Sequence, residues 1–65
     1  MLSENIKKIR KSKGLTQKDL ALQLNVVRQT VSKWELGSTT PELDKLIQLS
    51  DLFELSLDEL VGREN

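Results

Sequence analysis

The stretch that decides the fold is Thr16–Leu36, TQKDLALQLNVVRQTVSKWEL. At its start, the Thr16 hydroxyl can accept a hydrogen bond from a free backbone N–H of a first helical turn. Asp19, three residues later, is a short version of the acid that completes a capping box. Apolar residues then recur at helical spacing, at Leu20, Ala21 and Leu24. The pattern predicts a helix over residues 16–24.

A second helix is predicted directly after it, over residues 27–35. Asn25 is a natural break between the two, because asparagine tolerates the left-handed conformation that ends many helices. Val31 and Trp34 are expected to point inward, and Gly37 follows the expected end. The outer face carries polar side chains, at Arg28, Gln29, Ser32 and Lys33. Two helices joined by a tight corner, the second with a polar outer face, are typical of the helix-turn-helix arrangement.

The rest of the chain predicts three more helices, near residues 3–13, 41–53 and 57–61. Ser3 is expected to cap the first of these. Thr40 is expected to cap the second, with Pro41 at the first helical position, where proline is well tolerated. Ser56 and Glu59 have the spacing of a full capping box for the last. No strand is expected.

Length and composition narrow the structural and functional classes. A chain of 65 residues makes one domain. We therefore expect residues 1–65 to form a single all-α bundle of five short helices, with the helix-turn-helix proper at residues 16–36. The chain has no cysteine and no histidine, which removes disulfides, thiolate metal sites and the commonest general base. No metal or other cofactor is expected, and catalysis is the remotest function considered.

The sequence also bears on localisation. No apolar run approaches the ~20 residues needed to span a bilayer. The N-terminal MLSENIKKIRK is not a secretory signal. A soluble cytoplasmic protein of bacterial type is the expectation.

The charges are unevenly distributed although the net charge is zero. Residues 1–35 contain eight Lys or Arg against three Asp or Glu, a net of +5, while residues 36–65 contain two against seven, a net of −5. This asymmetry is consistent with a basic face for phosphates and an acidic face kept away from them. On charge alone, ordinary solvated helix surfaces explain it equally well.

Several of these residues together carry a family resemblance. They are Gly14–Gln17, Leu20, Ala21, Leu24, Arg28–Glu35, Gly37, Pro41 and Leu55–Leu60. In this order and spacing, over nearly the whole chain, the sequence resembles the Cro and phage-repressor class of helix-turn-helix DNA-binding domains, which have the lambda-repressor-like fold. The resemblance also implies that Leu43, Leu46, Leu49, Ser50 and Phe53 point inward.

The resemblance implies a DNA interface. The residues matching the family's base-reading positions are Arg28, Gln29 and Lys33, with Ser32 nearby. Those expected at backbone phosphates are Gln17, Lys18 and Thr30. The chemistry suits the task, because Arg and Lys can donate to guanine O6 and N7, and Gln can both donate and accept at adenine N6 and N7. Polar residues on an ordinary solvated helix are the alternative.

Two further residues are implied to pair. The family has an arginine at the position of Arg10 and an acid at that of Glu35, so an ion pair between the first and third helices is expected, with a phosphate contact by Arg10 as the rival. The chain also departs from the family, with Asn25 and Glu54 where glycine is usual. The third departure is Val27, which stands where the family commonly has a Ser or Thr that caps the third helix. Valine cannot cap, so either Asn25 or water covers the free N–H groups of that helix, or the helix starts at a different residue. The valine methyls could instead touch a thymine methyl.

The leading functional hypothesis is sequence-specific binding of double-stranded DNA by a transcriptional regulator, most simply a repressor. It would act as a homodimer on a pseudo-palindromic operator, with the third helix in the major groove. The candidate dimer contacts are Leu36, Ile47, Leu52, Leu57 and Val61, although scattered exposed apolar residues are common and any of these could be core. The alternative is an antitoxin-like or adaptor module that binds protein. No small-molecule ligand is evident.

Overall fold

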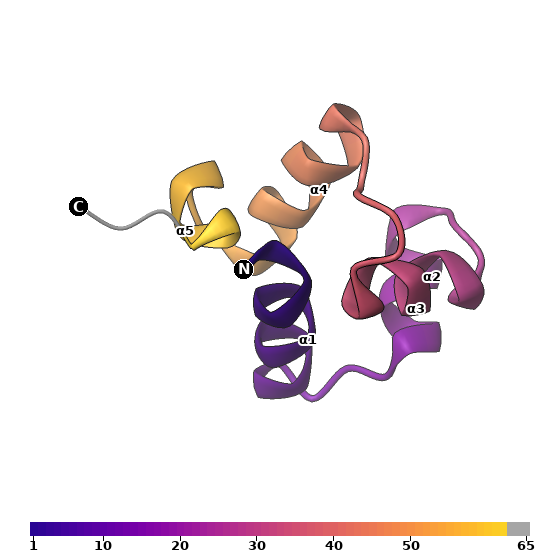
Figure 1. Ribbon diagram of the computed structural model, residues 1–65. Helices are drawn as coiled ribbons and strands as arrows, with labels where there is room; N and C mark the ends of the chain where they lie inside the picture. Colours follow the sequence, from indigo (N-terminus) through magenta and orange to yellow (C-terminus); the bar gives the residue numbers. More distant parts are fainter. Residues whose placement is uncertain (63–65) are drawn as a thin grey trace.

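The computed structural model describes residues 1–62. It contains five helices, which are α1 (Leu2–Ser12), α2 (Gln17–Leu24), α3 (Arg28–Leu36), α4 (Leu43–Phe53) and α5 (Leu57–Val61). In Figure 1, α1 stands between the α2–α3 pair on one side and α5 on the other, with α4 completing the bundle. The all-α, five-helix prediction is confirmed, and no strand occurs within these 62 residues.

Every helix contributes to one core. Its buried apolar residues are Ile6, Leu20, Ala21, Leu24, Val31, Trp34, Leu49, Phe53 and Leu60. The inward positions predicted for the helix-turn-helix are therefore confirmed. Burial of each large apolar side chain stabilises the fold by about 1.5–3 kcal/mol before the loss of conformational entropy is counted. The core thus holds α2 and α3 in place from beneath, and their polar faces stay outside.

Two helices start with the reciprocal caps that the sequence predicts. At α2 the Asp19 N–H donates to Thr16 Oγ1 at 3.0 Å, and the Thr16 N–H donates to Asp19 Oδ2 at 2.9 Å. At α5 the Glu59 N–H donates to Ser56 Oγ, and the Ser56 N–H donates to Glu59 Oε1, both at 3.1 Å. Each box satisfies two backbone N–H groups that a helix start otherwise leaves free.

The predicted start of α1 was wrong. This helix begins at Leu2 with Met1 as its N-cap, and no side chain caps it. Ser3 lies inside the first turn and therefore cannot be the cap. The Asn5 N–H already donates to the Met1 carbonyl at 3.0 Å, which extends the helical hydrogen bonding to the chain start.

The predicted start of α4 was also wrong. Thr40 does not cap this helix and Pro41 is not its first residue, because α4 begins at Leu43 with Glu42 as N-cap. Glu42 has extended backbone angles (φ −68°, ψ 163°), and its carbonyl accepts the Leu46 N–H at 2.9 Å. Pro41 is instead buried ahead of the helix.

Leu43 was predicted to point inward and does not. It is 66% exposed, in the first turn of α4 and about 120° around the helix from Leu49. The core line of α4 runs through Leu49 and Phe53, with Leu46 and Ser50 half-buried beside it. The first turn of α4 therefore extends past the edge of the core.

Two non-glycine residues end helices in the left-handed conformation. Asn25 (φ 58°, ψ 42°) ends α2 as predicted, and Glu54 (φ 57°, ψ 43°) ends α4. Glutamate lacks the short polar side chain that makes this conformation tolerable for asparagine, so Glu54 carries backbone strain of about 1–2 kcal/mol. The bend after α4 is thus built on an unfavourable residue, at a position where the resemblance implies glycine.

Candidate nucleic-acid interface

Arg10 and Glu35 form a buried, two-point ion pair. Arg10 Nε donates to Glu35 Oε2 at 2.6 Å and Arg10 Nη2 donates to Glu35 Oε1 at 3.2 Å. Arg10 Nη1 donates to the Leu15 carbonyl at 2.7 Å. The two side chains are only 8% and 3% exposed, so the guanidinium is directed into the protein. The pair joins α1, α3 and the loop before α2.

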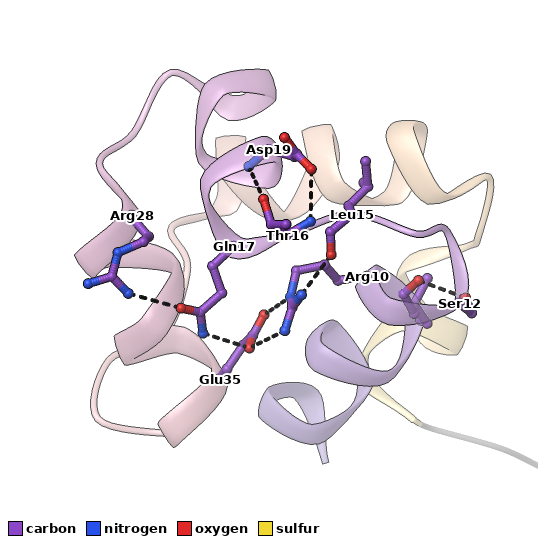
Figure 2. A network of polar contacts seen from close by, with 9 residues as sticks. Arg10, Ser12, Leu15, Thr16, Gln17, Asp19, Arg28 and Glu35 are labelled. Carbon is purple, nitrogen blue, oxygen red and sulfur yellow. Dashed lines mark hydrogen bonds and ion pairs between the residues drawn. The ribbon is translucent and has the colours of Figure 1, made fainter.

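Gln17 connects this pair to the surface. Its Nε2 donates to Glu35 Oε1 at 3.0 Å, and its Oε1 accepts from Arg28 Nη1 at 3.1 Å. Figure 2 shows the resulting chain of contacts, from the Leu15 carbonyl through Arg10, Glu35 and Gln17 to Arg28. Gln17 is half-buried at the first position of α2, and its Nε2 keeps a second N–H for another acceptor. The exposed Arg28 is therefore joined by one hydrogen bond to the network around the buried Arg10–Glu35 pair.

The polar side of α3 is open to solvent. We call it the α3 face, and it comprises Arg28, Gln29, Ser32 and Lys33. Ser32 is half-buried and the other three are exposed. Val31 and Trp34 occupy the opposite side, in the core. Thr30 is half-buried at the border of the α3 face, about 60° around the helix from Lys33 and about 40° from the buried Trp34. Lys18 is exposed beside Gln17 at the start of α2.

The start of α3 has no side-chain cap. Val27 is its N-cap residue, in extended conformation, and it is 63% exposed. No side chain, that of Asn25 included, makes a capping hydrogen bond to the free N–H groups of this helix. The only backbone bond made there is from the Thr30 N–H to the Val27 carbonyl, at 3.0 Å. The first turn of α3 therefore leaves donors free beside Arg28, in the part of the molecule where an anion is favoured by the helix dipole.

The capping box of α2 lowers the pKa of the Asp19 carboxyl. Hydrogen bonds from the Thr16 backbone and hydroxyl lower the pKa of the Asp19 carboxyl from its ordinary value of 3.8, and the charge of Lys18 adds to the effect. Asp19 is fully exposed, so its charge is screened by water. The carboxylate is nevertheless ionised at neutral pH and sits at the positive end of α2.

Sequence reasoning missed one residue that positions the corner between α2 and α3. Lys45 Nζ, from α4, donates to the Leu24 carbonyl at 2.7 Å. This carbonyl is one of those left free at the end of a helix, and an ammonium is a favourable partner there. A signal existed, because Lys45 is the only cation in α4 among two acids and many apolar residues. The sequence does not show which carbonyl Lys45 contacts, because that depends on how α4 docks against α2.

The five candidate dimer residues do not behave alike. Leu36, Ile47, Leu57 and Val61 are exposed, Leu36 the most at 76%. Leu52 is half-buried and packs against the core. Leu52 is therefore better described as part of the core than as a free apolar contact, because the last turn of α4 lies closer to the core than its first.

Residues 1–62 contain neither a candidate membrane-spanning helix nor a candidate metal site. No helix in this range has the length and apolar character needed to cross a bilayer. Nowhere in the same range do three or more Asp or Glu side chains gather closely enough to hold a metal ion.

Comparison with known proteins places this geometry in a family. A family profile described as helix-turn-helix matches residues 6–60. The chain is 43% identical over 65 residues to YqaE of Bacillus subtilis, an uncharacterized HTH-type transcriptional regulator, covering all of this chain and 56% of YqaE. It therefore spans little more than half the length of this relative.

Two solved structures are similar in fold. A transcriptional regulator from Listeria innocua superimposes with a TM-score of 0.94 at 40% identity, over 100% of this chain and 61% of that one. The P22 c2 repressor, crystallised in complex with a synthetic operator, gives 0.90 at 28% identity, over 98% of this chain and 97% of that one. The chain belongs to the helix-turn-helix family, in its Cro and phage-repressor class.

Proposed function

We propose that this chain is the DNA-binding domain of a bacterial transcriptional regulator. It recognises a specific duplex sequence by placing α3 in the major groove, and it acts most simply as a repressor. The observation that carries the proposal is the α3 face. This face is polar, exposed and attached to the start of α2 by the hydrogen bond between Arg28 and Gln17. A recognition helix and the helix before it must keep a fixed relation for one to enter the groove while the other meets the backbone.

The side chains of the α3 face suit the edges of base pairs. Arg28 and Lys33 can donate to guanine O6 and N7, Gln29 can pair with adenine N6 and N7, and Ser32 can serve either. Val27, exposed at the start of α3, can touch a thymine methyl. Gln17, Lys18 and Thr30 are assigned to phosphates, Gln17 through the N–H that the network leaves free.

The regulator would bind as a homodimer. Two-fold symmetry would place two copies of α3 about 34 Å apart on a pseudo-palindromic operator. The exposed apolar residues at the end of α3 and on α4 and α5 support such an interface, namely Leu36, Ile47, Leu57 and Val61. A domain of this size offers a small contact area, so we expect dimerisation to be weak without DNA.

Other functional classes are less well supported. The family and the relatives described above are transcriptional regulators rather than enzymes. The antitoxin-like alternative is not favoured, since those relatives are named as regulators and the P22 c2 repressor is described as bound to an operator. A regulator of this kind would work on the chromosome, in the cytoplasm.

Selection of bound duplexes from a random pool tests the proposal and yields the operator. The selected duplex and a scrambled one are then titrated with the wild type, Gln29→Ala and Gln48→Ala. Gln48 is exposed on α4, away from the α3 face, so it is a matched control for removal of a glutamine.

Loss of a base contact should weaken binding to the selected duplex by about 1–3 kcal/mol and hardly change binding to the scrambled one. We expect this for Gln29→Ala and no change for Gln48→Ala. Failure of the pool to converge on any sequence would overturn the proposed function. Equal weakening of both duplexes by Gln29→Ala would overturn the assignment of the α3 face.

A further inference from the structure

Two contacts define the side of α1 that faces α3. The Arg10 guanidinium binds Glu35 in α3. Nearer the start of α1, Ser3 lies beside Gly37, since a Cβ at Gly37 would be 3.7 Å from Ser3 Oγ. Residues 3 and 10 are about two turns apart and share one side of the helix. This side of α1 therefore runs along the C-terminal end of α3.

Two lysines lie next to this side, away from the core. Around the helix, Ile6 and Ile9 are about 40° and 100° to one side of Arg10, whereas Lys7 and Lys11 are about 60° and 100° to the other. Ile6 is buried and Ile9 packs against the core, while Lys7 and Lys11 are exposed. We call these two lysines the α1 edge.

The same division occurs on α3. Val31 and Trp34 lie to one side of Glu35, in the core, and the residues of the α3 face lie to the other. Because the ion pair between Arg10 and Glu35 joins the two helices, the sides of α1 and α3 that face the shared core lie on one side of that pair, and their polar sides lie on the other. The α1 edge and the α3 face therefore lie on the same side of the molecule.

The charge of the α1 edge is not neutralised within the described structure. The ion pair between Arg10 and Glu35 is the only one formed by residues 1–62. Glu4 lies on the same side in the first turn of α1, where it meets the positive end of the helix dipole. Lys8 points away from the α1 edge, into a groove between α1 and α5 that Glu59 also lines.

We propose that Lys7 and Lys11 bind the phosphodiester backbone of duplex DNA at the border of the groove that α3 enters. They continue the row of phosphate contacts from the start of α2 along α1. The partner is the sugar–phosphate backbone and not the bases, so these contacts add affinity without sequence preference. This inference rests on the DNA binding proposed above and adds α1, as a third helix, to the contacts proposed for α2 and α3.

Three single variants and the double variant Lys7→Ala with Lys11→Ala test the proposed phosphate contacts. Lys7→Ala, Lys11→Ala and Lys8→Ala each remove one positive charge from an exposed position of the same helix, so Lys8→Ala controls for the change in net charge. Binding to the selected and the scrambled duplex is titrated at several salt concentrations, and the thermal unfolding midpoint of each variant is measured. Each lost phosphate contact should make the slope of log K against log salt shallower by about 0.9.

We expect this decrease in the salt slope for Lys7→Ala and for Lys11→Ala, and about twice the decrease for the double variant. Each variant should bind the selected and the scrambled duplex more weakly by the same factor. Lys8→Ala should leave the slope near that of the wild type, and all unfolding midpoints should stay together. If the wild type binds selectively but Lys7→Ala and Lys11→Ala behave like Lys8→Ala, this inference is overturned and the proposed function survives. If the wild type shows no selective binding, the proposed function itself fails.

Discussion

Glu35 accepts three hydrogen bonds in the network that joins α1, α2 and α3. Its Oε2 accepts from Arg10 Nε, and its Oε1 accepts from both Arg10 Nη2 and Gln17 Nε2. The side chain is only 3% exposed. A carboxylate so fully paired is tolerated in the interior, but either partner left alone would be a buried charge without compensation.

Arg10→Met or Glu35→Leu alone should each destabilise the protein by about 3–5 kcal/mol, because each leaves the other charge buried and unpaired. The double variant should lose clearly less than the sum, since it removes both charges. Urea unfolding of the four proteins, followed by circular dichroism, gives the double-mutant cycle. Additive losses would contradict the assignment of the pair as one energetic unit.

Gln17 and Arg28 should act together in DNA binding. Arg28 is exposed and its hydrogen bond to Gln17 Oε1 holds it against the network, so removal of Gln17 leaves Arg28 free to move. We expect Gln17→Ala and Arg28→Ala to be non-additive in binding free energy by about 0.5–1.5 kcal/mol. A parallel cycle with Lys18→Ala, an exposed neighbour without that bond, should be additive. The same coupling in both cycles would show that the hydrogen bond is not its cause.

Asp19 should make the stability of the helix-turn-helix depend on pH. Its pKa is lowered in the folded protein by the Thr16 hydrogen bonds. The ionised cap therefore contributes its full stability above the unfolded-state pKa and loses it as pH falls through the folded-state pKa. The stability difference between the wild type and Asp19→Asn should be largest at neutral pH and shrink below pH 3.8. Urea midpoints from pH 7 to pH 2 measure it, and a difference that grows on acidification would refute the direction of the shift.

Among the helices, α4 is the one whose start departed most from expectation, because it begins at Leu43 rather than Pro41 and exposes Leu43 in its first turn. Its end at Phe53 is as predicted, and Glu54 follows in the strained left-handed conformation. Its middle nevertheless serves the candidate interface, because Lys45 holds the end of α2. The helix thus positions the corner before α3 through one polar contact and through the burial of Leu49 and Phe53.

Glu54→Gly should stabilise the protein, since glycine adopts the left-handed conformation without the Cβ penalty. The expected gain is about 0.5–1 kcal/mol, because the flexibility of glycine in the unfolded chain offsets part of the relief. Asn25→Gly is the matched control at the end of α2, and it should gain less, as asparagine already tolerates this conformation. The denaturant midpoints of the wild type, Glu54→Gly and Asn25→Gly measure these differences in stability. A loss of stability in Glu54→Gly would rule out strain at this position.

For the whole molecule, the proposed dimer makes a prediction about stoichiometry on the operator. Ile47→Lys places a charge in the apolar surface of α4 and should lower the affinity for a duplex with two half-sites by about tenfold or more. Binding to a single half-site should change little. Gln48→Lys adds the same charge at the next residue and serves as the control. Analytical ultracentrifugation of the complexes gives the number of copies bound, and unchanged paired binding by Ile47→Lys would exclude α4 from the interface.

The distribution of charge over the whole molecule supports a one-sided interface. Residues 1–35 carry a net charge of +5 and residues 36–65 a net of −5. The first set includes α1, α2 and all of α3 except its last residue, Leu36. The acidic residues of α4 and α5 repel phosphates, so they disfavour approach of DNA from that side.

Sequence alone determined the features of this protein that depend on neighbours three or four residues apart. The boxes at Thr16 and Ser56, the break at Asn25 and the inward line of Leu20 and Leu24 are set by local hydrogen bonding and helical periodicity. The family resemblance added the pairing of the first and third helices. The caps, the break and the inward line are local and hold whatever the rest of the fold does, whereas the pairing also requires the first and third helices to dock together.

Only the tertiary structure decided the features that depend on how the helices dock. Pro41 is buried before α4 rather than opening it, Leu52 packs on the core, and Lys45 reaches the Leu24 carbonyl. Gln17 likewise bridges Glu35 and Arg28, 18 and 11 residues away. No periodicity connects residues so far apart, because their separation in space is set by the packing of the shared core and not by the geometry of any one helix.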